Sequence, residues 1–188
     1  MRHEQSAAHA AEGYARVTGK VGVCLATSGP GATNLITGLM AAKMDSAPVV
    51  AITGQVARSA MGKEAFQECD TTGIATPVTK RTFLVLRASD LADTVHEAFE
   101  VATSGRPGPV LIDVPKDVQQ EFTEYKPHSS ISIPSNNGSY EGLEESLQQA
   151  AELINTSQRP VIIAGHGVLI SQGWEELRAL AEKANIPI

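Results

Sequence analysis

Cysteines and aromatic residues are scarce in this sequence. Two cysteines occur among its 188 residues, and 4% of the residues are aromatic. Cys24 and Cys69 have no metal-ligand spacing, and Cys24 lies in an apolar run typical of a buried strand. A sequence of this kind is expected to come from a reduced, cytoplasmic protein.

Basic clusters and long apolar runs are also lacking. The chain carries a net charge of −6 and has a pI near 5.4, which argues against nucleic-acid binding. No apolar run approaches the roughly 20 residues that a membrane-spanning helix needs, and no signal or transit peptide is recognised at the amino end. Small molecules and other proteins are the expected partners, with no nucleic acid and no membrane.

Strand-like and helix-like segments alternate through residues 1–125. Helices are predicted in "EQSAAHAAEGYARVTG", "ATNLITGLMAAKMD" and "SDLADTVHEAFEVATSG", and apolar strands in "KVGVCLAT", "APVVAITG", "TFLVLR" and "GPVLIDVP". The first strand is expected to be covered on both faces, and Ser89 is expected to cap the third helix. The alternation predicts an α/β fold, a parallel sheet with helices on both faces, whose ligands bind beyond the carboxyl ends of the strands.

The composition of the sequence changes after residue 125. Residues 126–139 are polar and rich in Pro, Ser, Asn and Gly, which predicts a linker. Residues 140–188 predict a helix, a buried strand in "RPVIIAG" and another helix, which would be the start of a second α/β domain. The first domain, residues 1–125, lacks a strand before its first helix, and the second domain stops at "IPI". We therefore expect a fragment or one half of a split protein.

The segment "TSGPGATN" is the first candidate for a binding site. Gly29 and Gly31 let the backbone approach a ligand, and Thr33 with Asn34 is placed to cap the following helix, whose amide groups favour polar or anionic groups. A Gly-Pro-Gly turn between a strand and a helix is also a common structural feature. This one matches neither the P-loop nor the dinucleotide-binding pattern, so on the residues alone both interpretations stand.

Glu4 is the second candidate, since it begins the first helix. A carboxylate at that position is favoured by the helix dipole whether or not it has a catalytic role. The neighbouring His3 and His9 do not have the spacing of an H-E-x-x-H zinc site, so no metal site is expected here. Composition does not decide between a helix cap and a catalytic carboxylate.

Six segments occur in an order that resembles a known family. They are "RHEQSAAHAAEGYARVTGK", "TSGPGATNLITGL", "DSAPVVAITGQV", "AFQECD", "SGRPGPVLIDVPKDV" and "RPVIIAGHGV". In this order they resemble the large, catalytic subunit of acetolactate synthase (acetohydroxyacid synthase), a thiamine-diphosphate-dependent enzyme. The resemblance covers nearly the whole chain, and it implies a pyrimidine-binding domain followed by the start of a central domain.

The resemblance implies a catalytic role for Glu4. In this family the glutamate at the matching position hydrogen-bonds the N1′ atom of the aminopyrimidine ring of thiamine diphosphate. A carboxylate in an apolar cleft can share a proton with that nitrogen, which helps the amino group of the cofactor to take a proton from thiazolium C2. The family's reaction condenses two pyruvates, or pyruvate and 2-oxobutyrate, with loss of CO2, toward the branched-chain amino acids.

The resemblance also implies roles for residues around the pyrimidine ring and the reacting centre. Pro30 and Asn34 match the loop and helix start beside the pyrimidine. Phe66 and Gln67 match a pair beside the reacting centre, where the glutamine is a polar partner for cofactor and substrate. Lys116 matches a lysine near the substrate channel. Without the resemblance, Phe66 could equally belong to the core and Lys116 could be a solvated loop cation.

FAD is a second cofactor that the resemblance implies, although it does no net redox work in the main reaction. Arg106 matches an arginine that contacts FAD, and Gly165, His166 and Gly167 match a glycine-rich loop along it. His166 stands where the family often has a glycine. The family holds Mg²⁺ and the diphosphate in a carboxyl-terminal domain that carries a G-D-G segment, which this sequence lacks. The isolated chain is therefore expected to bind thiamine diphosphate weakly or not at all and to make no acetolactate.

The partners that the resemblance implies are a 2-oxo acid such as pyruvate and further copies of the chain, in a homodimer or homotetramer. A regulatory subunit or a split carboxyl-terminal chain is a further expected partner. Two alternatives stand beside acetolactate synthase. One is another thiamine-diphosphate carboligase or 2-oxo acid decarboxylase, and the other is a non-catalytic remnant or split-subunit binding module.

Overall fold

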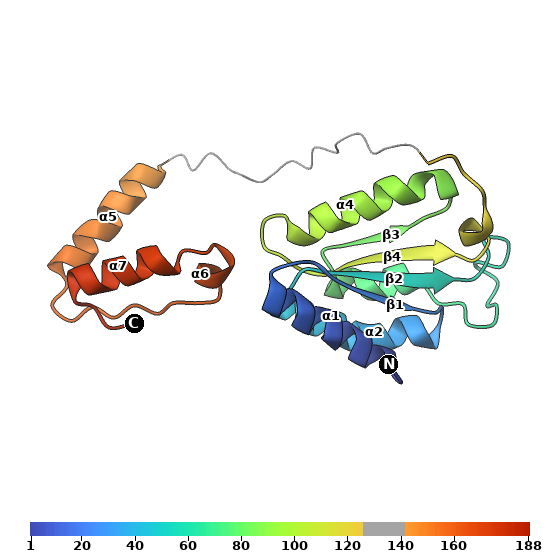
Figure 1. Cartoon of the computed structure of the whole chain (residues 1–188), viewed down its shortest axis with the longest axis horizontal. Helices are drawn as coiled ribbons and strands as arrows, with labels where there is room; N and C mark the ends of the chain where they lie inside the picture. The colour runs from blue at the N-terminus through green and yellow to red at the C-terminus, as the bar shows by residue number, and fades with distance from the viewer. Residues whose placement is uncertain (126–141) are drawn as a thin grey trace. The chain divides into compact units, whose positions relative to one another are not determined.

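The computed structural model describes residues 1–125 and 142–188. The chain divides into two compact units, Met1–Asn136 and Asn137–Ile188 (Figure 1). The predicted linker, residues 126–139, lies outside the described residues. The two units are described separately below.

A parallel sheet of four strands forms the centre of the first unit. The strands are β1 (Gly22–Ala26), β2 (Val49–Gln55), β3 (Arg81–Leu84) and β4 (Val110–Pro115), in the spatial order β1-β2-β4-β3. Every neighbouring pair is parallel, with Cys24 opposite Ala51 and Ile52 opposite Ile112. Each strand forms at or next to its predicted position, so the predicted parallel α/β fold is confirmed.

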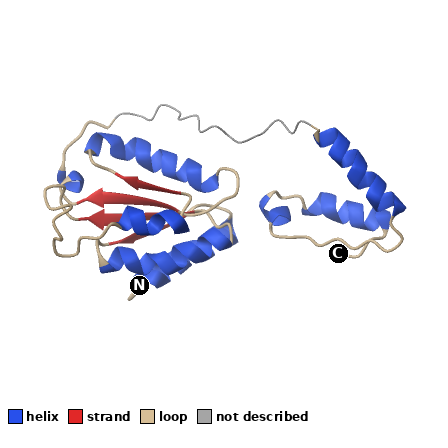
Figure 2. Cartoon of the chain, turned by 180° about the vertical axis from the view of Figure 1, so that it is seen from behind, coloured by secondary structure: helices blue, strands red, loops and turns tan. Residues whose placement is uncertain are grey.

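Helices cover both faces of this sheet, as predicted (Figures 1 and 2). The helices of the unit are α1 (Glu4–Thr18), α2 (Pro30–Met44), the short α3 (Thr71–Ala75) and α4 (Leu91–Thr103), with 3-10 turns η1 (Thr76–Val78), η2 (Ala88–Asp90) and η3 (Val118–Gln120). One core cluster joins α1 and α2 to the sheet, and a second joins α4 to the opposite face. Successive residues of β4 point to opposite faces of the sheet, so Leu111 belongs to the first cluster and Ile112 to the second.

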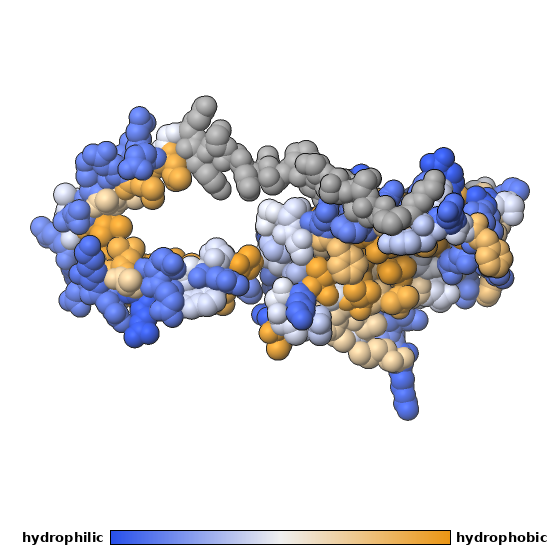
Figure 3. Space-filling view, turned by 45° about the horizontal axis from the view of Figure 1, so that its top comes forward, coloured by the Kyte–Doolittle hydropathy of each residue, from blue (hydrophilic) through white to orange (hydrophobic). Residues whose placement is uncertain are grey.

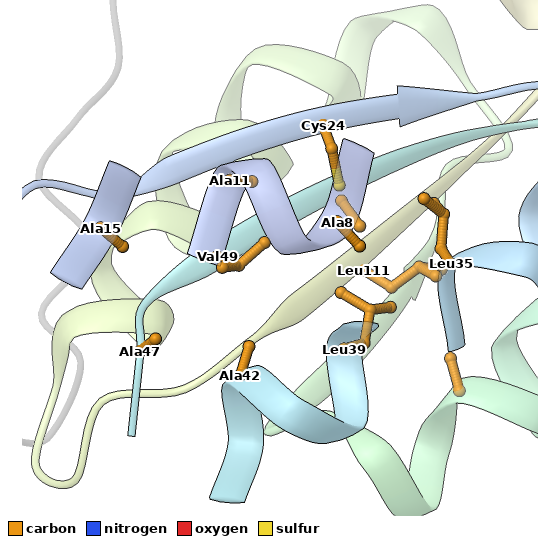
Figure 4. Close-up of a cluster of buried hydrophobic side chains, with 12 residues drawn as sticks. Ala8, Ala11, Ala15, Cys24, Leu35, Leu39, Ala42, Ala47, Val49 and Leu111 are labelled. Carbon is orange, nitrogen blue, oxygen red and sulfur yellow. The ribbon is translucent and has the colours of Figure 1, made fainter. Parts of the chain in front are cut away.

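Small residues let α1 and α2 pack closely (Figure 4). Ala8, Ala11 and Ala15 on α1 are buried. A Cβ atom added to Gly38 of α2 would lie 2.4 Å from the Cβ of Ala8. The first strand is equally close to α1, since a Cβ atom added to Gly22 of β1 would lie 2.0 Å from the carbonyl oxygen of Ala11. A larger side chain would not fit at these contacts, so close packing accounts for the small residues.

The expectation that β1 is covered on both faces is wrong. Cys24 is buried under α1, but Val23 is 44% exposed and Leu25 is 67% exposed. The reason is that β1 is an edge strand, and α4 packs over β2, β3 and β4 on the opposite face. Figure 3 shows apolar residues reaching the surface of this unit.

The predicted cap at Ser89 is also wrong. Ser89 lies within η2, and Asp90 is the N-cap of α4 without a side-chain cap hydrogen bond. The hydroxyl of Ser89 instead donates to Oδ1 of Asp90, 3.1 Å away. The 3-10 turn that precedes the helix moves the start of α4 beyond the serine.

The described part of the second unit consists of helices and extended segments. Its helices are α5 (Leu143–Thr156), α6 (Gly167–Ile170) and α7 (Trp174–Ala184). The strand predicted in "RPVIIAG" does not form, and Ile163 is 95% exposed. Within the described residues, Ile162 N donates to Pro187 O at 2.9 Å, but a strand needs a ladder of such bonds to a neighbour.

No helix in the described part of the chain is both long enough and apolar enough to span a membrane.

Two glycine substitutions test the packing of α1 against α2. Gly38→Ala should lower the free energy of unfolding by about 1–3 kcal/mol, because the new methyl group overpacks against Ala8. Gly13→Ala, on the exposed side of α1, meets nothing within 4 Å and should raise that free energy by about 0.5–1 kcal/mol. Urea unfolding of the 188-residue chain measures both. Equal effects of the two substitutions would contradict the packing argument.

Candidate active site at the carboxyl ends of the strands

The first helix and the loops after β1 and β2 carry the predicted pyrimidine-site residues to one edge of the sheet. Residues 27–29 lead from β1 into α2, and residues 56–70 lead from β2 into α3. Parallel α/β sheets bind ligands beyond the carboxyl ends of their strands, and both loops lie there.

Glu4 and Asn34 form a hydrogen-bonded pair between α1 and α2. The amide nitrogen Nδ2 of Asn34 donates to Oε2 of Glu4 at 3.0 Å. One turn further along both helices, Ala8 meets Gly38. Because the two contacts have the same spacing on α1 and α2, the helices run in the same direction, and their packing sets the distance between the carboxylate and the amide.

The hydrogen bond from Asn34 is the main cause that lowers the pKa of Glu4 below the ordinary value for a glutamate. A backbone hydrogen bond and the nearby His3 lower the pKa of Glu4 further, and desolvation opposes them. Glu4 is half-buried, and most of the residues that line its hollow are apolar. At neutral pH this group is therefore ionised, an acceptor of hydrogen bonds.

In the Gly-Pro-Gly turn, the backbone of Gly29 lies close to Gln67, and the backbone of Gly31 lies close to Glu4. Gly29 has a φ of +61°, and a Cβ atom there would lie 2.8 Å from the carbonyl oxygen of Gln67. A Cβ atom on Gly31 would lie 2.7 Å from Cγ2 of Thr27 and 3.4 Å from Oε1 of Glu4. Larger residues at either position would separate the two loops or crowd the carboxylate.

The start of α2 differs from the expected cap. Gly29 is the N-cap, without a side-chain cap hydrogen bond, and Pro30 occupies the first turn, where its missing N–H has no cost. The hydroxyl of Thr33 donates to the carbonyl oxygen of Pro30, and Asn34 donates to Glu4. The expectation that Thr33 and Asn34 cap this helix is therefore wrong, because Asn34 turns toward α1.

A cleft of about 870 Å³ lies beside this turn, and Phe66, Gln67 and Lys116 all line it. The Phe66 side chain is 88% exposed, which rules out the alternative that it belongs to the core. Glu4 lines a neighbouring hollow of about 730 Å³. The two hollows share Leu25, Ala26 and Thr27 at the end of β1, so the structure brings the predicted residues to adjoining surfaces.

Sequence reasoning missed a buried polar network behind the cleft. Nε2 of Gln55 donates to the carbonyl oxygen of Cys69 at 2.7 Å and to Oδ2 of Asp113 at 2.9 Å, and Oε1 of Gln55 accepts from Val56 N at 2.9 Å. Asp113 also accepts from the hydroxyl of Thr53 at 2.7 Å. The side chain of Gln55 thus ties together the two ends of the loop that carries Phe66 and Gln67.

The pKa of Asp113 is raised, chiefly because the carboxyl group is buried, while its hydrogen bonds from Thr53 and Gln55 act in the opposite direction. A signal for this network was present in the sequence. Three polar residues, Thr53, Gln55 and Asp113, interrupt the carboxyl halves of two otherwise apolar strands. A polar residue in a buried strand requires a partner.

The residues expected to contact FAD are divided between the two units, Arg106 in the first and Gly165, His166 and Gly167 in the second, and each set is described by itself. Arg106 donates to Ser46 Oγ at 2.8 Å and to Met44 O at 2.9 Å, and so caps the carboxyl end of α2, away from Glu4. In the second unit, a Cβ atom on Gly165 or Gly167 would meet nothing within 4 Å. Among the described residues, no protein atom therefore lies close enough to Gly165 or Gly167 to require the absence of a Cβ atom there.

His166 directly precedes α6 as its N-cap residue and makes no side-chain cap hydrogen bond. Within residues 1–125 and 142–188, no three His, Cys, Asp or Glu side chains are grouped so that they could hold a metal ion.

The fold and the paired Glu4 and Asn34 define an α/β domain whose polar site lies beyond the strand ends. Two family models match the chain: "Thiamine pyrophosphate enzyme, N-terminal TPP binding domain" over residues 1–74, and "Thiamine pyrophosphate enzyme, central domain" over residues 147–188. The chain belongs to the thiamine pyrophosphate enzymes.

Curated relatives give the particular branch of this family. The chain is 51% identical over 188 residues to an acetolactate synthase of Mycobacterium leprae, and it covers 30% of that protein. It is 49% identical over 188 residues to the acetolactate synthase large subunit of Corynebacterium glutamicum, again covering 30%. It is also 49% identical over 190 residues to a probable acetolactate synthase large subunit of Methanocaldococcus jannaschii, covering 32%. The whole chain is thus similar to acetolactate synthase large subunits and spans about a third of their length.

Removal of the Asn34 amide tests the origin of the lowered pKa of Glu4. In Asn34→Ala the pKa of Glu4 should rise toward the ordinary value, because the largest cause of its shift is gone. Titration of the Glu4 side-chain carbon by NMR measures the pKa. Thr33→Ala is the matched control, since the Thr33 hydroxyl bonds to Pro30 and not to Glu4.

The same pair has a consequence for stability. A carboxylate with a lowered pKa in the folded state stabilises that state above its unfolded pKa, and the stabilisation is lost as the pH falls through the folded pKa. The wild-type chain should therefore lose more stability on acidification than Asn34→Ala. An unchanged Glu4 pKa in that variant would refute the assignment.

Proposed function

We propose that this chain forms the pyrimidine-binding part of a thiamine-diphosphate-dependent acetolactate synthase. The observation that carries the proposal is the Glu4 carboxylate, which Asn34 holds at 3.0 Å beside the Gly-Pro-Gly turn. The similarity of the whole chain to acetolactate synthase large subunits supports it. The proposed reaction joins two 2-oxo acids, with pyruvate as donor, and releases CO2.

The residues present fit the pyrimidine end of thiamine diphosphate. An ionised carboxylate is the acceptor that a protonated ring nitrogen requires, and the glycines on either side of Pro30 keep the backbone close to that position. When bound, thiamine diphosphate supplies the nucleophilic carbon of the reaction. Glu4 holds the proton at the pyrimidine nitrogen, and Asn34 fixes the orientation of the carboxylate.

The cleft supplies groups suited to 2-oxo acids. The exposed ring of Phe66 provides an apolar surface at the cleft, and the amide of Gln67 offers both a donor and an acceptor. Lys116 places a cation at the same cleft, where it can attract the substrate carboxylate. We assign Gln67 to substrate and cofactor contacts and Lys116 to substrate entry.

FAD, Mg²⁺, a cytoplasmic location and assembly as a dimer or tetramer belong to this proposal through the family resemblance. No catalytic step is assigned to FAD or Mg²⁺, and residues 1–125 and 142–188 contain no group of three His, Cys, Asp or Glu side chains that could hold the metal ion. The isolated chain should make no acetolactate, since it spans about a third of its curated relatives.

Other thiamine-dependent carboligases or 2-oxo acid decarboxylases would use the same carboxylate, but the curated relatives favour acetolactate synthase. A non-catalytic remnant is disfavoured by the intact pair of Glu4 and Asn34 and by the glycines that surround it.

A chimera tests the proposal. The 188 residues replace the matching segment of the Mycobacterium leprae enzyme, and acetolactate formation from pyruvate is measured with thiamine diphosphate, Mg²⁺ and FAD supplied. We expect an active chimera in which Glu4→Gln lowers kcat by roughly 10²–10⁴-fold, the usual contribution of an acid–base group. Glu144→Gln, an exposed glutamate at the start of α5, should leave kcat unchanged. A folded but inactive chimera, or full activity of Glu4→Gln, would refute the proposal.

A further inference from the structure

The loop of residues 56–70 has an ordered conformation although it contains little regular secondary structure. Glu64 and Gln67 have φ angles of 55° and 60°. A non-glycine residue in this left-handed region is disfavoured, at a cost of roughly 1 kcal/mol or more, and it persists where its surroundings enforce it. Something must therefore hold the loop around Gln67.

Glu68, the residue directly after Gln67, turns its carboxylate back into its own loop. Oε2 of Glu68 accepts from Ala65 N at 2.9 Å and from Lys63 N at 3.3 Å, and Oε1 accepts from Gly62 N. Several amide groups converging on one carboxylate form a nest for an anion. Hydrogen bonds of this charge-assisted kind are stronger than neutral ones.

The pKa of Glu68 agrees with this geometry. The hydrogen bonds from Ala65 N and Gly62 N are the two largest causes that lower it, so the carboxylate is ionised at neutral pH. The backbone of Glu68 closes the same turn, since its N–H donates to the carbonyl oxygen of Ala65 at 2.9 Å.

Gln67 is consequently confined from two sides. Glu68 and its amide nest lie on one side. Gly29 lies on the other side. It is so close that a Cβ atom added to it would lie 2.8 Å from the carbonyl oxygen of Gln67. Nε2 of Gln55 donates to the carbonyl oxygen of Cys69 at 2.7 Å, and this hydrogen bond holds the carboxyl end of the loop.

We propose that Glu68 is a positioning residue of the site. Its carboxylate closes residues 62–68 into one conformation, and in that conformation Phe66 and Gln67 face the cleft. Glu68 acts through its neighbours and is not itself assigned a contact with substrate or cofactor. The effect on catalysis rests on the proposed function, whereas the effect on the loop does not.

Amide hydrogen exchange in the full 188-residue chain tests the loop directly. In Glu68→Gln, the amides of Gly62 and Ala65 should exchange at least about tenfold faster than in the wild type, the effect of losing a charge-assisted hydrogen bond. Glu64→Gln is the matched control, because it alters an exposed glutamate of the same loop and should leave these rates unchanged. Urea unfolding shows whether the fold of each variant is intact.

Chemical rescue identifies the carboxylate itself. Glu68→Ala leaves the amide nest without its anion, so added acetate should slow the exchange of Gly62 and Ala65 in this variant and not in the wild type. Equal exchange in Glu68→Gln and the wild type would overturn the proposal. Fast exchange in Glu68→Ala that acetate does not slow would overturn it as well.

Kinetics in the Mycobacterium leprae chimera test the positioning role. Glu68→Gln should lower kcat/KM for pyruvate by roughly 10- to 100-fold, because a displaced group near the reacting centre is expected to cost about that much. Combined with Gln67→Ala, it should add little to the loss caused by Gln67→Ala alone. Additive losses would overturn the role through Gln67. A chimera inactive in every version would refute the proposed function and leave the exchange result standing.

Discussion

The close packing of α1 against α2 is the constraint on which the site depends. Ala8 and Gly38 meet where α2 has no room for another methyl group. One turn earlier on both helices, the same packing sets Glu4 at hydrogen-bond distance from Asn34. The same helix packing therefore produces both the Ala8–Gly38 contact and the Glu4–Asn34 hydrogen bond. The small residues of α1 thus position the site and also pack the core.

The other half of the site is held by polar groups. Gln55 ties the two ends of its loop together and is itself held by Asp113, which lies in the buried sheet. Glu68 binds the amides inside that loop. A rigid sheet thus positions a loop, and the loop presents Phe66 and Gln67 at the cleft.

The elements that sequence predicted well are those governed by apolar periodicity. All four strands of the first unit form at or next to an apolar run, and the two central strands, β2 and β4, are the ones that the helical layers bury most fully. Predictions that depended on neighbours were less successful. "RPVIIAG" has the same apolar character but finds no ladder of hydrogen bonds among the described residues, and β1 is exposed on one face because it is an edge strand.

The candidate site could be predicted as a set of residues but not as an arrangement. The motifs named Glu4, Asn34 and Gln67, yet the chain separates Glu4 from Asn34 by thirty positions, and no local pattern indicates that the two side chains meet. Local reasoning assigned Asn34 to the cap of its own helix. The tertiary contact with α1 takes precedence, because a charge-assisted hydrogen bond to a carboxylate is stronger than a bond to a neutral backbone group.

Two carboxyl groups of this unit, Asp113 and Glu4, have pKa values displaced in opposite directions, and they differ also in accessibility. Burial raises the pKa of Asp113, whose oxygens are occupied by Thr53 and Gln55 inside the core. A hydrogen bond lowers the pKa of Glu4, whose hollow adjoins the cleft. A perturbed pKa often marks a catalytic group, but structural networks perturb pKa values too. Accessibility decides between them here: Asp113 can only support the loop, whereas Glu4 remains an ionised acceptor that a ligand can reach.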